Sequence, residues 1–129
     1  MKLRITVPVR YRDIDSMGHV NNAVYLSYFE QARIGYFMEA IGGEWNWTEH
    51  GTIVARHEID YLRPILLNDT VFIDTYIESA GESSFIMCYE VYNQKNKMCT
   101  KGKTVLVCYD FRAQKKSPVP EKWKALVMV

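Results

Sequence analysis

The sequence predicts an α+β domain in which one long helix packs against a mainly antiparallel sheet. The chain has 129 residues, which suits a single domain over 1–129. One stretch has the periodicity of a long helix, whereas the residues before and after it alternate as strands do. Apolar residues make up 48% of the chain, so a core can form. A sheet wrapped around the helix is the simplest way to bury both apolar surfaces.

The first strand is expected at residues 3–12, LRITVPVRYR, which are rich in β-forming residues and roughly alternate. Pro8 has no N–H to donate to a neighbouring strand. The strand is therefore expected to lie at a sheet edge or to contain a bulge.

A long helix is expected over residues 22–41. Asn21 and Asn22 are candidate N-caps, and Gly42 is a candidate C-terminal stop. The segment makes about five turns and has a broad apolar face. Residues three and four apart form that face: Tyr25, Phe29, Ala32, Tyr36 and Ala40.

The residues after the helix carry only strand signals, separated by short polar or Gly-containing turns. Alternation places Ile53 and His57 on one face of the strand at 53–63. It likewise places the apolar residues of 71–77 on one face of the next strand. Cys88 and Cys108 are interpreted as small apolar core residues. The four strands are expected at 53–63, 70–78, 85–93 and 101–112.

Composition and charge exclude several classes of function. Sixteen Lys and Arg against fifteen Asp and Glu give a net charge of +1, which offers no reason to expect nucleic acid as a partner. The longest apolar runs are five residues, too short to span a membrane, and the N-terminus has no signal-like apolar run. Three cysteines without CxxC spacing indicate reduced thiols in a cytoplasmic protein, with no metal site and no cofactor.

The segment with the most chemistry is 10–25, RYRDIDSMGHVNNAVY. Asp13 and Asp15 precede a helix N-terminus, which offers unpaired backbone N–H groups and the positive end of the helix dipole. A carboxylate there can cap the helix, or it can act on a carbonyl held by those N–H groups, as acyl transfer requires. Residue types alone favour capping, and they favour structural roles for Asp13 and His19.

A resemblance favours the catalytic role. The segment resembles the signature of the hotdog-fold acyl-CoA thioesterases of the 4-hydroxybenzoyl-CoA thioesterase-like family: an aromatic residue, D-x-D-x-x-G and an Asn/Tyr-rich helix start. The GHVNN form also resembles acyl-acyl-carrier-protein thioesterases, and YFEQAR at 28–33 is similar to the family's E-x-A-R helix. The residues that carry the signature are Tyr11, Asp13, Asp15, Gly18, Asn21, Asn22 and Tyr25.

The resemblance implies a hotdog fold, with one long central helix wrapped by a five-stranded mainly antiparallel sheet. It also implies hydrolysis of an acyl-CoA thioester to free acid and CoA. Asp15 is then the nucleophile or the general base for water, and the backbone N–H of Asn22 polarises the carbonyl. The substrate is expected to contact Gly18, His19, Asn21, Tyr25, Arg56 and Ser84.

The nucleotide end departs from the family pattern. The family's phosphate-binding stretch corresponds to 80–84, where Ser84 is kept but Glu82 would repel phosphate. Acyl carrier protein, with its acidic surface, is therefore an alternative carrier. Four basic residues are alternative phosphate partners: Arg56, Arg63, Lys101 and Lys103.

Two further functions and an oligomeric state complete the expectations. A hotdog dehydratase or hydratase needs a His on the central helix, and 22–41 contains none. A non-catalytic acyl-CoA-binding module has no need of Asp15 beside a thioester. The apolar outer sheet face and an open strand edge predict a homodimer or homotetramer, formed by edge-to-edge continuation of the sheet.

Overall fold

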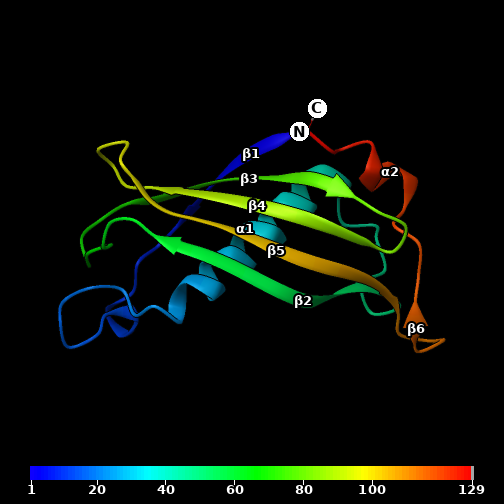
Figure 1. Ribbon diagram of the computed structural model, residues 1–129, viewed down its shortest axis with the longest axis horizontal. Coiled ribbons are helices and arrows are strands. Elements are labelled where there is room, and N and C mark those ends of the chain that lie inside the picture. The colour runs from blue at the N-terminus through cyan, green and yellow to red at the C-terminus, as the bar shows by residue number, and fades with distance from the viewer. Residues whose placement is uncertain (129) are drawn as a thin grey trace.

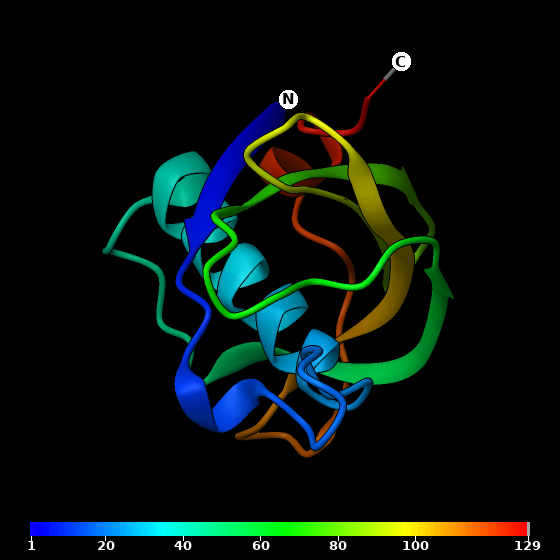
Figure 2. The same cartoon turned by 90° about the vertical axis from the view of Figure 1, so that its left-hand side faces the viewer.

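A computed structural model describes residues 1–128, and its sheet wraps one long helix as the sequence predicts. Every strand pairing is antiparallel, in the order β1-β3-β4-β5-β2, with β6 paired to β5. Figure 1 shows the strands side by side over α1, and Figure 2 shows the sheet curving around it. The elements are β1 (Lys2–Val7), the 3₁₀ helix η1 (Tyr11–Asp13), α1 (Val24–Ile41), β2 (His50–Tyr61), β3 (Val71–Ala80), β4 (Ser84–Tyr92), β5 (Met98–Asp110), β6 (Lys115–Lys116) and α2 (Glu121–Lys124).

The first strand is shorter than predicted because it stops at Val7, immediately before Pro8. Residues 11–13 form η1 instead of continuing the strand. β1 lies at one edge of the sheet, so the edge position expected from Pro8 is confirmed.

Helix α1 begins two residues later than predicted, and its N-cap is Ala23, not an asparagine. Asn21 still stabilises this end. Its side-chain oxygen accepts the Ala23 N–H at 2.9 Å, and its carbonyl accepts the Val24 N–H at 2.9 Å. The helix ends at Gly42, as predicted, where the Gly42 N–H donates to the Met38 carbonyl at 3.1 Å.

A β-bulge in β2 changes one predicted face. The register against β5 shifts between Val54 and Arg56, so the intervening residue has no partner of its own. His57 then lies opposite the buried Thr104, facing α1. Ile53 lies on the outer face instead and is 42% exposed.

The core lies between α1 and the inner face of the sheet. The inward residues of β3 are buried as predicted, from Val71 to Ile77. Phe29 of α1 stacks on Tyr89 of β4 with ring centroids 4.3 Å apart. The helix passes so close to β5 at Gly102 that a Cβ there would lie 2.5 Å from the Phe29 ring.

Candidate active site

A tight loop before α1 carries the predicted catalytic segment. Ile14 and Val20 form an isolated antiparallel bridge, and the Asp15 N–H donates to the His19 carbonyl at 2.8 Å. The Gly18 N–H donates to the Asp15 carbonyl at 3.1 Å. Gly18 has a φ of +81°, a left-handed conformation that glycine adopts without strain. The loop therefore places Asp15 directly before the helix, at the end of the molecule opposite α2 (Figure 1).

The Asp15 carboxylate does not cap α1, which was one of the two roles considered from the sequence, because its hydrogen bonds go to its own loop. Its Oδ1 atom accepts the Met17 N–H at 2.9 Å and the His19 N–H at 3.3 Å, which holds the loop closed. Its Oδ2 atom accepts no hydrogen bond from residues 1–128. The side chain is half-buried, so one oxygen serves the turn and the other remains available to a substrate.

The start of α1 supplies a hydrogen-bond donor beside this carboxylate. The Asn22 N–H donates to no acceptor within the described part of the chain. The Asn22 carbonyl accepts the Tyr61 hydroxyl at 2.9 Å, which ties the end of β2 to the helix start. A free N–H at this position is the kind of donor that stabilises a developing oxyanion.

A cavity of about 350 Å³ brings these groups together. Gly18 and Asn21 do not line it, but their backbone hydrogen bonds shape the adjoining loop and helix start. Tyr25 is in the cavity wall, and burial raises the pKa of its phenol, so Tyr25 stays neutral. Four residues of the predicted site line the cavity: Asp15, His19, Asn22 and Tyr25. Arg63, one of the alternative phosphate partners, lines it too. Five more lining residues were not assigned to the site from the sequence: Met17, Val20, Tyr61, Leu62 and Pro64.

The lining residues from outside the Asp15 loop and α1 come from the end of β2 and the segment after it. The Tyr61 ring meets the Tyr25 ring edge-on, with centroids 5.0 Å apart. The N–H groups of Leu62 and Arg63 both donate to the Cys99 carbonyl, at 2.9 and 3.0 Å, which fixes this segment beside α1. From the sequence, Arg63 was considered only as an alternative phosphate partner, and Tyr61 and Leu62 had no assigned role, because their approach to α1 depends on tertiary contacts.

Arg56 and Ser84 do not join this cavity within one chain. Arg56 forms an ion pair with Glu58 at 2.7 Å on the outer surface of β2. It lies five residues before Tyr61, or about 17 Å along an extended strand. Ser84 pairs with a β5 residue opposite Ile53, so it lies further still from the helix start.

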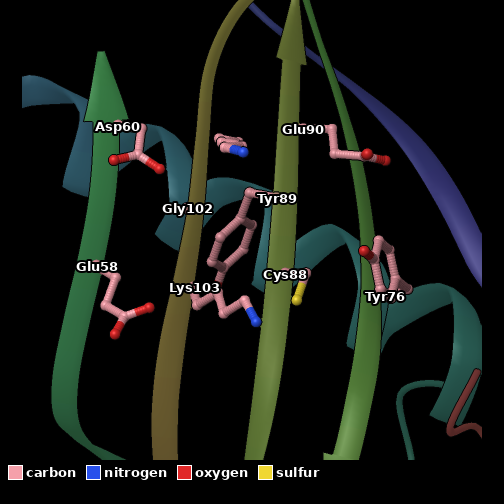
Figure 3. A pocket seen from close by; sticks show the side chains of 9 residues that line it. Glu58, Asp60, Tyr76, Cys88, Tyr89, Glu90, Gly102 and Lys103 are labelled. Atoms are coloured by element: carbon pink, nitrogen blue, oxygen red, sulfur yellow. The ribbon is translucent and has the colours of Figure 1, made fainter. Parts of the chain in front are cut away.

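A second hollow of about 210 Å³ lies on the outer face of the sheet (Figure 3). Lys101 and Lys103, two of the alternative phosphate partners, line it and therefore lie away from the Asp15 cavity. Lys103 of this hollow pairs with Glu78 at 2.8 Å, and its Glu90 pairs with Lys2 at 2.8 Å. Cys88 lies here. It is buried, as predicted, but strand alternation puts it on the face opposite to Tyr89, and burial raises the pKa of its thiol to about 11.

Three further features of residues 1–128 bear on membranes, metals and thiols. No helix within 1–128 combines the length and apolar character needed to cross a membrane. The same residues contain no cluster of three or more His, Cys, Asp or Glu side chains that could hold a metal ion. All three cysteines are free and buried.

Comparison with known proteins identifies the family. Residues 9–127 match the thioesterase-like superfamily. The chain belongs to this superfamily. It is 33% identical to the uncharacterized protein YsmA of Bacillus subtilis (strain 168) over 101 residues, which cover 78% of this chain and 68% of that protein. It is 26% identical to the acyl-CoA thioester hydrolase YbgC of Escherichia coli O6:H1 over 124 residues, covering 92% and 90%.

Solved structures of thioesterases agree with this assignment. A thioesterase from Thermus thermophilus, complexed with coenzyme A and zinc, is 42% identical with a TM-score of 0.82, over 98% of this chain and 97% of that one. The predicted hotdog fold and the predicted thioesterase family are therefore confirmed. The chain is a thioester hydrolase by family, and its site residues remain predictions.

Proposed function

We propose that this thioesterase hydrolyses acyl-CoA to free acid and CoA at the cavity beside Asp15. One observation carries the proposal: Asp15 and Asn22 border the same cavity at the start of α1, and neither Asp15 Oδ2 nor the Asn22 N–H has a hydrogen-bond partner within residues 1–128. The names of the relatives support the substrate class. YbgC is an acyl-CoA thioester hydrolase, and the Thermus thermophilus thioesterase was solved with coenzyme A.

Two routes use these groups. In the first, Asp15 takes a proton from water while the water oxygen attacks the thioester carbonyl. In the second, Asp15 attacks the carbonyl itself, and water then hydrolyses the resulting anhydride. In both, the C–S bond breaks, the thiolate leaves and takes a proton, and one water is consumed. The Asn22 N–H donates to the carbonyl oxygen as negative charge develops on it.

The decisive experiment replaces Asp15 by Asn and measures CoA release with a thiol-reactive dye. Asn keeps a side-chain oxygen for the Met17 and His19 N–H groups, so the loop should stay folded. We expect kcat to fall about 10²- to 10⁴-fold, because the proton acceptor or nucleophile is lost. Unchanged turnover in this variant would reject the site.

Matched controls separate catalysis from turn formation. Asp110→Asn alters another carboxylate that accepts two backbone N–H groups, from Arg112 and Ala113, and should leave kcat within about twofold. Asn22→Ala keeps the backbone N–H and should also retain activity. A large loss in Asn22→Ala would mean that the side chain, not the main chain, acts on the carbonyl.

The carrier can be tested directly. Arg63 borders the cavity and forms no ion pair within residues 1–128, so it is available to an anionic group of CoA or of acyl carrier protein. Turnover of the same acyl group on each carrier distinguishes them. We expect acyl-CoA to be preferred, and Arg63→Gln to raise KM a few-fold with kcat kept.

A homodimer formed through β2 belongs to the same proposal. β2 is an open edge of the sheet, and a groove of about 560 Å³ runs between it and α1. Ile34 and Met38 in this groove are 54% and 68% exposed, an apolar surface typical of an interface. Antiparallel pairing of two β2 strands would put Ser84 of the partner subunit in the same half of the joint sheet as the Asp15 end.

Sedimentation tests the dimer. The wild-type chain should sediment as a dimer or tetramer at micromolar concentration, whereas Met38→Glu should shift it toward monomer. Lys95→Glu, in the distant β4–β5 turn, is the control for an added acid. A wild-type monomer would overturn this part of the proposal and leave the single-chain site intact.

A further inference from the structure

Asp13, the first carboxylate of the D-x-D segment, is buried beside the candidate site. It is 9% exposed, whereas Asp15 two residues later is half-buried. Its Oδ2 atom accepts the Tyr28 hydroxyl at 2.8 Å and the Arg10 N–H at 2.9 Å. A buried carboxylate is stable only when hydrogen bonds or charges replace water, and these two bonds serve that purpose.

The backbone of Asp13 also holds the end of the Asp15 loop. The Asp13 carbonyl accepts the Asn21 N–H at 2.8 Å. Both ends of the loop from 14 to 20 therefore lie at Asp13, and the adjacent Ile14–Val20 bridge closes the loop. Any displacement of Asp13 moves both ends of the loop.

Tyr28 connects this residue to the helix. It lies in the second turn of α1, and its side chain is 1% exposed in the core. Burial first, and then the Asp13 carboxylate, raise the pKa of the phenol, so Tyr28 remains a hydrogen-bond donor at all relevant pH values. The hydrogen bond from the Tyr28 hydroxyl to the Asp13 carboxylate thus connects α1 to the residue that holds both ends of the Asp15 loop.

We propose that Asp13 and Tyr28 are positioning residues, which fix the Asp15 carboxylate relative to the free N–H group at the start of α1. This inference rests on the proposed function. Neither residue borders the cavity, so neither touches substrate in this arrangement. Their effect is geometric: the loop carrying Asp15 and the helix carrying the donor are joined through one buried hydrogen bond.

The test is Tyr28→Phe, which removes the hydroxyl and keeps the ring in the core. We expect kcat to fall about 10- to 100-fold with KM within about twofold, because small misplacement of a reacting group is costly while carrier contacts are kept. Asp13→Ala should lower kcat and preserve KM in the same way. Asp13→Asn keeps an oxygen acceptor and should recover most of the lost kcat.

Tyr36→Phe is the matched control. Tyr36 is also a buried tyrosine of α1, and its hydroxyl donates to the Met1 carbonyl at 3.0 Å, far along the helix from the loop. Both variants should lower the melting temperature by similar amounts. Only Tyr28→Phe should lower kcat.

The outcomes separate the inference from the function on which it rests. If the wild-type enzyme releases CoA but Tyr28→Phe matches Tyr36→Phe in kcat, the positioning role is wrong and the proposed function stands. A fall in kcat that Asp13→Asn does not recover also overturns it, since the charge rather than the bond would then matter. If the wild-type enzyme releases no CoA from any acyl-CoA, the proposed function itself fails.

Discussion

Asp15 and Asp110 hold similar turns at opposite ends of the molecule. Each uses its Oδ1 atom to accept two backbone N–H groups from the residues that follow, at 2.9 to 3.3 Å for Asp15 and 2.9 to 3.0 Å for Asp110. Asp15 precedes a long helix, and the Asn22 N–H at the start of that helix has no acceptor among residues 1–128. Asp110 ends β5 and turns the chain into the two-residue β6.

The surroundings, not the turn, distinguish the two carboxylates. A hollow of about 340 Å³ also lies beside Asp110, but its walls include the Trp45 and Trp123 rings and no start of a long helix. Trp123 packs against Phe37, Trp45, Trp47 and Phe85 with ring centroids 5.1 to 5.7 Å apart. One end of α1 leaves polar groups available for chemistry, and the other end is closed by aromatic packing.

The largest effect on stability is expected at the aromatic end. Trp123→Ala removes a side chain that is 1% exposed and should lower the free energy of unfolding by about 3–5 kcal/mol. The kcat of the folded fraction should stay within about twofold, because the Asp15 cavity is at the other end. Urea unfolding and active-site-normalised turnover measure the two quantities.

Trp123→Phe sharpens that result. It keeps an aromatic ring and removes the indole N–H, which has no partner in the described structure. The loss of stability should therefore be much smaller than for alanine. A comparable fall in kcat for Trp123→Ala and Asp15→Asn would break the distinction between the two ends.

An intermediate effect is expected in the Asp15 turn. Gly18→Ala forces a residue with a Cβ into a φ of +81° and should cost about 1–2 kcal/mol in the free energy of unfolding. Because the strain falls on the loop that carries Asp15, kcat should decrease as well. Gly43→Ala is the control, since a Cβ there meets nothing within 4 Å and Gly43 has no positive φ. Equal stability of the two variants would contradict the assigned loop conformation.

The smallest effect concerns pH and the Asp110 turn. The Ala113 and Arg112 N–H groups hold the pKa of Asp110 below its ordinary value of 3.8. The unfolded chain therefore takes up the proton first, and the stabilisation is present above pH 3.8 and lost as pH falls toward the folded pKa. Asp110→Asn should lose less unfolding free energy than the wild type between about pH 5 and pH 3. Parallel pH profiles for both proteins would contradict the assignment.

Local patterns predicted most of the fold. The periodicity from Tyr25 to Ala40 placed α1 within two residues at its start, and alternation located all four later strands. The bulge at Val54/Arg56 has no local signal, because it depends on how β2 pairs with β5. The sequence analysis placed Cys88 in the core, but it lies on the outer face of the sheet. Side chains of neighbouring strands bury it there, and a local pattern does not show such burial.

The candidate site was predictable where it is contiguous. Asp15 and Asn22 lie in one short segment, and the cavity brings them together. Tyr61 and Arg63 arrive from the far end of β2 through tertiary contacts that spacing does not encode. Ser84 was assigned from a family position alone, and a single chain keeps it at the other end of the sheet.

The close passage of α1 over β5 leads to an expectation about evolution. Phe29 occupies the space that any side chain at position 102 would need, because a Cβ there would lie 2.5 Å from its ring. Relatives that keep an aromatic residue at position 29 should therefore keep glycine at 102. A larger residue at 102 would need both a smaller residue at 29 and a displaced β2 backbone, because the same Cβ would lie 2.8 Å from the Glu58 carbonyl oxygen. An alignment in which the two positions vary independently would mean that the helix shifts between family members, and with it the separation of the Asp15 loop from the sheet.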